Sequence, residues 1–443
     1  MSINAGYDDA PVDVLGIGFG PSNLALAIAL QEQGLSGSAA GESGRLRFVE
    51  RQSRFGWHQG MLLDGARMQI SFLKDLATMR SPSSPYTFLR YLQDRGRLVD
   101  FINGRNFFPS RIEFHDYLEW AAARFSGIVE YGSEVIGIEP VYTGDLVQEV
   151  DVVVQRADGV RRHRARNVVF AAGLQPWTPK GITLSDQIWH SSELLHRLRE
   201  IDVAKIGMAL VVGAGQSAAE VTSHLHQVCP SAQIHSVFAR FGYSVADDSP
   251  FANRIFDPEA VDVHFRAAPE IRQMLRRYHD GTNYSVVDLD LITGLFERSY
   301  QEKVVHDQRL YFHNLSRITR CVQTPAGAEV TVHDLARGLT ESMICDLVVF
   351  ATGYRPVDPR CFLGPLLEHC RLDTDGGVAL GRDYRVLTTP QIRSRIFVQG
   401  ATEDSHGLSS VLLSNTAVRA GEIAESLAEA LREQGRPLTA AAG

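Results

Sequence analysis

The stretch Asp13–Gly34, DVLGIGFGPSNLALAIALQEQG, decides the fold of this 443-residue chain. Its apolar first residues predict a buried strand, its glycines a tight turn, and the residues from Pro21 onward a helix. Gly18 and Gly20 let a pyrophosphate approach the backbone at the positive end of that helix. Asn23 stands where the usual nucleotide-binding pattern has its third glycine, which predicts looser packing of the helix on the strand.

The next predicted strand, RLRFVE, ends at Glu50, where an acidic residue can bind a ribose hydroxyl of a dinucleotide. Its separation from Gly18 exceeds the usual ~20 residues, and the segment GLSGSAAGESG accounts for the excess. A glycine-rich strand end by itself is often only a turn. The succession of strand, turn, helix and second strand favours a dinucleotide site.

The same pattern returns in MALVVGAGQSAAEVTSHLHQV, with Gly213 and Gly215 in the turn and Ala218 at the third glycine position. The following strand leads to Arg240, where a site for NAD has an acidic residue. A guanidinium there can pair with a ribose 2′-phosphate, so the sequence favours NADPH over NADH. The alternative is an ordinary solvated arginine.

These two strand–turn–helix–strand segments predict an α/β fold with two Rossmann-like dinucleotide-binding domains, one for FAD and one for NADPH. Further apolar strands end in glycine in RNVVFAAG, CDLVVFATG and RIFVQGA, which predicts crossings between the domains. We expect residues 1–180 and 345–443 to form the FAD-binding domain and 181–344 the NADPH-binding domain. A small, mainly helical substrate-binding region is expected at about 245–310.

The composition argues against several kinds of binding partner and of site. The formal net charge is −8, which gives no electrostatic footprint for nucleic acid or an anionic membrane. No apolar run approaches the ~18 residues of a membrane span. The five cysteines form no CxxC pair, which argues against a zinc site, a disulfide framework or a dithiol reductase and for a cytoplasmic location.

Taken in order, the chain contains GIGFGPSN, WHQGMLL, MQISFLKDLATMRSPSSPYTFLRYL, FFPSRIEFHDYLEW, GAGQSAAE, ADDSPFANRIFDP, TNYSVVD, FATGYRP and SHGLSSVLLSN. In order and spacing these stretches resemble the flavin-dependent N-hydroxylating monooxygenases of siderophore biosynthesis. The likeness is closest to the L-ornithine N5-monooxygenases, with the lysine N6-monooxygenases as relatives, and covers roughly residues 12–425. Asn23 matches the pattern of this family.

The resemblance implies a reaction. NADPH reduces FAD, O₂ adds to the flavin, and the flavin hydroperoxide transfers oxygen to a side-chain amine, giving N5-hydroxyornithine for a siderophore or related hydroxamate product. The protein then needs no metal and no covalent or acid–base catalytic residue, because the cofactor performs the difficult step. It must hold the amine uncharged and exclude water, so activity should rise with pH until the bound amine is neutral.

The resemblance also assigns residues to the two cofactors. For FAD it implies Gly18, Gly20, Pro21, Ser22, Asn23, Glu50, Trp57, His58, Gln69, His406, Gly407 and Leu408. For NADP it implies Gly213, Gly215, Gln216, Ser217, Arg240, Asn283 and Ser285. Gln69 and Asn283 are expected beside the flavin ring.

For the substrate, the resemblance implies that Lys74 binds the carboxylate of the amino acid, with Asn253, Asn283 and Ser410 as further contacts. A cation on a long side chain suits this role. Read singly, a lysine is usually a solvated surface residue and an asparagine a turn or cap residue.

Several alternatives stay open. L-Lysine or a diamine would be substrates of the same class, and a flavin reductase or a non-catalytic nucleotide-binding regulator would lie outside it. The related FxGxxxHS fingerprint is reduced here to His190 and Ser191, which disfavours a Baeyer–Villiger oxygenase. The family also implies a homo-oligomer, expected as a homotetramer.

Overall fold

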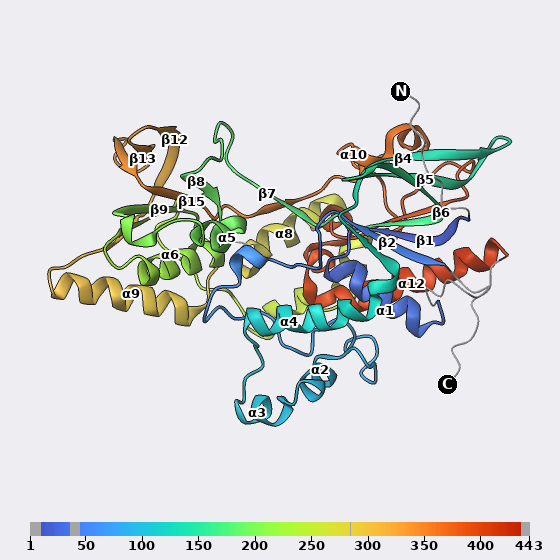
Figure 1. Cartoon of the computed structure of the whole chain (residues 1–443), viewed down its shortest axis with the longest axis horizontal. Coiled ribbons are helices and arrows are strands. Elements are labelled where there is room, and N and C mark those ends of the chain that lie inside the picture. Colours follow the sequence, from blue (N-terminus) through green and yellow to red (C-terminus); the bar gives the residue numbers. More distant parts are fainter. Residues whose placement is uncertain (1–9, 36–44, 284, 436–443) are drawn as a thin grey trace.

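The computed structural model describes residues 10–35, 45–283 and 285–435. It is a mixed α/β structure with two separate parallel-strand sheets, one at each end of the elongated molecule (Figure 1). Asn283 is the last residue of a helix, but its side chain falls outside the described part. No helix in the described ranges is long and apolar enough to pass through a bilayer.

The first sheet has the strand order β3-β2-β1-β6-β5-β4, and β17 pairs with β6. Strands β3, β2, β1, β6 and β17 are parallel, and β5 and β4 extend the sheet in antiparallel fashion. Its strands are β1 (Val12–Ile17), β2 (Leu46–Glu50), β3 (Val129–Tyr131), β4 (Glu134–Thr143), β5 (Leu146–Arg156), β6 (Gly159–Phe170) and β17 (Arg395–Val398). Strands from the two ends of the chain therefore share one sheet.

Helices pack around the first sheet into the largest apolar core. Helix α1 is buried along almost its whole length, because it lies between the sheet and α12. The helices of this half are α1 (Pro21–Glu32), α2 (Phe88–Asp94), α3 (Leu98–Asn103), α4 (Arg111–Ala122), α10 (Arg360–Leu363), α11 (Glu403–His406) and α12 (Thr416–Glu433). Short 3₁₀ helices are η1 (Gln59–Met61), η2 (Ala123–Ile128), η6 (Gly364–His369), η7 (Leu408–Val411) and η8 (Leu413–Asn415).

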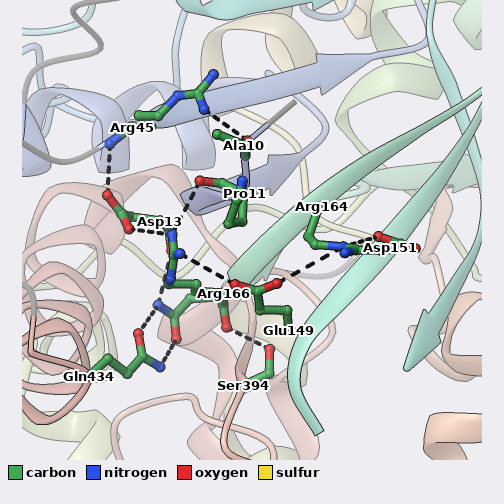
Figure 2. A network of polar contacts seen from close by, with 11 residues as sticks. Ala10, Pro11, Asp13, Arg45, Glu149, Asp151, Arg164, Arg166, Ser394 and Gln434 are labelled. Carbon is green, nitrogen blue, oxygen red and sulfur yellow. Dashed lines mark hydrogen bonds and ion pairs between the residues drawn. The ribbon is translucent and has the colours of Figure 1, made fainter. Parts of the chain in front are cut away.

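A charged network joins the amino end of β1 to the part of β6 that pairs with it (Figure 2). Arg166 donates to Asp13 at 3.0 Å and forms an ion pair with Glu149 at 3.3 Å. The hydroxyl of Ser394, next to β17, donates to the Arg166 carbonyl at 2.6 Å. This edge of the sheet is occupied by the protein's own groups, so the open edge is the carboxyl one, where ligands bind in parallel sheets.

The second sheet is fully parallel, with the order β11-β10-β9-β15-β8. Its strands are β8 (Ile188–His190), β9 (Met208–Val212), β10 (Gln233–Val237), β11 (Leu310–His313) and β15 (Leu347–Phe350). Its helical elements are η3 (Ser191–Glu193), α5 (Leu194–Leu198), η4 (Val203–Lys205), α6 (Gln216–Val228) and α9 (Leu289–Val304). A three-stranded antiparallel sheet, β12 (Ser316–Thr324), β13 (Gly327–Asp334) and β14 (Thr340–Cys345), packs beside it.

Two short strands connect the halves. After β6 the chain runs through β7 (Leu174–Pro176), and after β15 it returns through β16 (Tyr354–Pro356); β7 and β16 pair antiparallel. The first two predicted crossings are therefore confirmed. The third is wrong, because β17 belongs to the first sheet and the chain after it continues into α11 of the same half.

The segment between β10 and β11 is mainly helical, as the sequence predicts. It contains η5 (Ala252–Phe256), α7 (Glu259–Arg266), α8 (Pro269–Asn283) and then α9. Arg276 of α8 forms a 2.8 Å ion pair with Asp404 of α11, and Arg382 pairs with Asp262 of α7 at 3.0 Å. Although it follows a strand of the second sheet, this segment thus also contacts the first half.

Candidate active site

The first glycine turn lies between β1 and α1 and is open at the helix end. Gly18 has φ +80°, and a Cβ there would lie 2.4 Å from the Ala171 carbonyl oxygen, so glycine is required. A Cβ at Gly20 would meet nothing within 4 Å. The amino end of α1, at Pro21, therefore faces open space that suits the pyrophosphate of FAD.

Asn23 is fully buried and joins the turn to its surroundings. Its amide donates to the carbonyls of Gly18 at 2.7 Å and Ile17 at 3.2 Å, and its oxygen accepts from Gln399 at 3.0 Å. The close approach of neighbouring elements occurs instead at Gly16, where a Cβ would lie 2.1 Å from the Phe48 ring. The predicted looser packing at Asn23 is therefore wrong, because hydrogen bonds replace the contact that a glycine allows.

Glu50 ends β2 beside this turn. One carboxylate oxygen accepts from the Phe19 backbone N–H at 2.7 Å, and the other from that of Gln52 at 2.9 Å. Each oxygen keeps a further lone pair. The carboxylate is thus fixed next to the turn, in the position expected for a ribose contact.

Trp57 and His58 lie where the two halves meet. The His58 ring packs edge-on against Trp57 at 4.8 Å and against Tyr354 of β16 at 5.5 Å. On its other side Tyr354 contacts His190, 5.1 Å between centroids. Close by, Gly60 is packed so tightly that a Cβ would lie 1.8 Å from the Ser192 carbonyl oxygen.

The second glycine turn brings together most of its predicted NADP contacts. A Cβ at Gly213 would lie 2.4 Å from the Ala351 carbonyl oxygen, and one at Gly215 would lie 3.3 Å from the Cα of Ser285. Arg240 donates to the Ser285 carbonyl at 2.8 Å. An exposed guanidinium beside this glycine turn fits a 2′-phosphate.

Asp288, which the sequence interpretation did not single out, connects residues predicted for the two cofactors. It accepts from Gln216 at 2.9 Å and from Gln69 at 3.3 Å, and its backbone N–H donates to Gln216. Gln216 also donates to Glu220 of α6 at 3.0 Å. The only signal in the sequence was that Asp288 ends the TNYSVVD stretch, which does not reveal its partners.

Ser217 follows Gln216 in the first turn of α6 and is partly exposed. Glu220 accepts two hydrogen bonds of 2.8 Å from Arg111, at the start of α4. This pair joins the halves through side chains that are 14% and 5% exposed. Neither partner was predicted, since a salt bridge between distant segments leaves no local pattern.

Lys74 and Asn253 come from distant segments that the fold brings together. The Lys74 ammonium lies 6.0 Å from the ring centroid of Phe256, at the end of the same short helix that contains Asn253. Within the described ranges Lys74 forms no ion pair, so its charge is available for a carboxylate. The Asn253 amide donates to the Asp248 carbonyl at 2.8 Å, and its oxygen accepts no hydrogen bond from the described residues.

The segment His406–Ser410 packs beneath α7. His406 is fully buried between Tyr384 and Phe265, and burial lowers its pKa to about 4. Gly407 has φ +82°, and a Cβ there would clash with the His264 ring. Leu408, partly exposed, begins η7.

Ser410, predicted to bind substrate, is fully buried. Its hydroxyl donates to the Gly407 carbonyl at 2.7 Å and lies 2.9 Å from the hydroxyl of Thr402. These contacts suit a residue that shapes the loop. Among the described residues, no group of three or more His, Cys, Asp or Glu side chains could hold a metal ion.

Comparison with known proteins supports the two cofactor sites described above. The model of the L-lysine 6-monooxygenase/L-ornithine 5-monooxygenase family matches residues 10–356. The L-ornithine N(5)-monooxygenase of Pseudomonas aeruginosa is 38% identical over 427 residues, 95% of this chain and 94% of that protein. That of Burkholderia cepacia is 42% identical over 405 residues, 89% of each.

Solved structures give the same result. The ornithine N-hydroxylase of Kutzneria sp. 744, determined with reduced FAD, NADP⁺ and L-ornithine, superposes with a TM-score of 0.90 at 45% identity, covering 96% of this chain and all of that one. The L-lysine 6-monooxygenase of Pseudomonas syringae gives 0.82 at 32% identity, covering 95% and 100%. This chain belongs to the L-lysine 6-monooxygenase/L-ornithine 5-monooxygenase family and is an FAD- and NADPH-dependent monooxygenase.

Proposed function

We propose that this enzyme hydroxylates the side-chain amine of L-ornithine, with FAD at the first glycine turn and NADPH at the second. The observation that carries the substrate assignment is the ammonium of Lys74, held beside η5 without a counter-ion in the described chain. Ornithine is also the substrate named for the relatives from Pseudomonas aeruginosa, Burkholderia cepacia and Kutzneria. L-Lysine is the alternative, and the extra methylene is worth only about 1–3 kcal/mol to a pocket.

In this proposal the bound flavin, reduced by NADPH, activates O₂ and supplies the oxygen atom. The protein's own residues bind and orient. Lys74 holds the carboxylate, and Asn253, Asn283 and the segment around Ser410 border the substrate. Fixing the far end of the amino acid places the terminal amine at a defined distance from the flavin, which lowers the entropic cost of reaction.

The proposal divides the chain at the two crossings. Residues 1–180 and 345–443 form the FAD-binding domain, 181–344 the NADPH-binding domain, and about 245–310 the substrate region. The strand pairing supports this division except at its second boundary: β1–β6 and β17 share one sheet and β8–β11 the other, but β15 (Leu347–Phe350) also belongs to the second sheet, which moves that boundary to the end of β15. The ion pairs of α7 and α8 with the first half support a substrate region that spans both.

We also propose a cytoplasmic homotetramer. The free state of all five cysteines agrees with a reducing compartment. An exposed apolar stripe on α9, formed by Leu289, Phe296, Tyr300 and Val304, is suited to contact another subunit. Light scattering of the purified protein tests the tetramer, and a monomer at micromolar concentration would contradict it.

The substrate assignment is tested with ornithine, lysine and putrescine, measuring hydroxylamine formed against hydrogen peroxide released. Lys74→Met should raise the KM for ornithine about 10–150-fold, the worth of a charge-assisted hydrogen bond of about 1.5–3 kcal/mol. Putrescine has no carboxylate, so its KM should change less than twofold. Lys205→Met, which removes an exposed lysine, is the matched control. Equal losses for ornithine and putrescine would contradict the role of Lys74.

A further inference from the structure

Arg419 is a buried cation without a counter-charge. It lies in the first part of α12 and is 1% exposed. Its guanidinium donates only to neutral acceptors: the Ser410 carbonyl, Gln399 at 3.2 Å, the Ser22 hydroxyl at 2.9 Å and the Thr416 hydroxyl at 3.4 Å. In the part of the chain that the structure describes, no carboxylate forms an ion pair with it.

The nearest acidic side chain on α12 is already engaged. Glu422 accepts two hydrogen bonds from Arg382, at 2.8 and 3.0 Å. A buried charge without a partner is costly, and proteins pair such groups with an opposite charge. Within the described residues Glu422 therefore acts on Arg419 only through space, and no carboxylate forms an ion pair with it.

The surroundings of Arg419 make its charge less favourable still. It lies near the amino end of α12, and it donates to Ser22 in the first turn of α1. The amino end of a helix carries a partial positive charge, which favours anions and disfavours cations. Two positive helix ends and a guanidinium therefore converge behind the first glycine turn, where only an anion can balance them.

A chain of hydrogen bonds connects this charge to the turn. Gln399 accepts from Arg419 and donates to Asn23, which in turn donates to the Gly18 carbonyl. This chain explains why the turn has an asparagine where a glycine is usual. The open space in front of Gly20 lies at the same helix end.

We propose that Arg419 is the buried counter-charge for the pyrophosphate of FAD. It acts through Ser22 and Asn23 without touching the cofactor, and so is a positioning residue. The inference rests on the proposed placement of FAD at the first turn. It predicts that Arg419 matters for the phosphate part of a ligand and not for its uncharged part.

The test uses the full-length chain freed of flavin and titrated calorimetrically with FAD, ADP and adenosine. Arg419→Gln should weaken ADP and FAD binding at least about tenfold and adenosine binding less than twofold. Arg419→Lys, which keeps the charge, should recover most of the loss. Arg432→Gln, at an exposed position of the same helix, is the control and should change nothing.

Two further variants distinguish a failure of the proposed role of Arg419 from a failure of the proposed FAD placement. Ser22→Ala removes the link while leaving Arg419 in place, and should weaken ADP selectively even if Arg419→Gln does not fold. Equal losses for ADP and adenosine, or none for either, would overturn the proposal. Gly18→Val tests the placement of FAD, and unchanged ADP binding in that variant would refute the placement itself.

Discussion

The ion pair of Arg111 and Glu220 should contribute strongly to the free energy of unfolding, because it joins the two halves of the enzyme. Two hydrogen bonds of 2.8 Å join the side chains, which are 14% and 5% exposed. Replacing Arg111 by Met leaves the more deeply buried Glu220 carboxylate with Gln216 as its remaining side-chain donor among the described residues. Breaking a buried pair in this way costs about 3–5 kcal/mol.

Replacing both residues should cost less than the sum of the single changes, since no unpaired charge remains. We expect Arg111→Met to cost about 3–5 kcal/mol, Glu220→Gln somewhat less, and the double variant to show a coupling free energy of about 2–3 kcal/mol. Urea unfolding of the four proteins, followed by circular dichroism and tryptophan fluorescence, measures this cycle. Additive effects, with coupling below about 0.5 kcal/mol, would refute the reasoning.

Three further outcomes are expected. Arg240→Gln should raise the KM for NADPH about 10–150-fold and leave that for NADH within twofold, in steady-state oxidation assays; equal changes would contradict a 2′-phosphate contact. Gly60→Ala should lower the melting temperature, because its Cβ would meet the Ser192 carbonyl oxygen at 1.8 Å, whereas Gly127→Ala, whose Cβ meets nothing within 4 Å, should not. His406 has a folded pKa of about 4 against about 6.5 unfolded, so the unfolded chain binds more protons in this window and stability falls on acidification. That loss is about 3 kcal/mol between pH 7.5 and 4, and His406→Gln should flatten this pH dependence of urea unfolding.

The sequence predicted the elements whose signals are local. Both glycine turns, the strands before them and the helices after them depend on neighbouring residues, and so does the acid that ends β2. The two crossings were recognised for the same reason, whereas β17 was misassigned because a strand ending in glycine does not reveal which sheet it joins.

The contacts that complete the site were not predictable in this way. Asn23 was read as a defect in packing because its partner, Gln399, is 376 residues away in the chain. Asp288 and the pair of Arg111 and Glu220 likewise join segments far apart in sequence. A single sequence indicates that such polar residues exist but not which of them meet.

The strand β17 has a consequence for how the protein is made. The first sheet and the cover of α1 remain incomplete until Arg395–Val398 and α12 have been synthesised. At about 5–20 residues per second, the ribosome needs roughly 10–45 s between the end of β6 and β17. By then all strands of the second sheet have been synthesised, since β15 is the last of them in the chain. The middle of the chain can therefore fold before its beginning. Until α12 is made, the apolar surface of α1 must be shielded in the nascent protein.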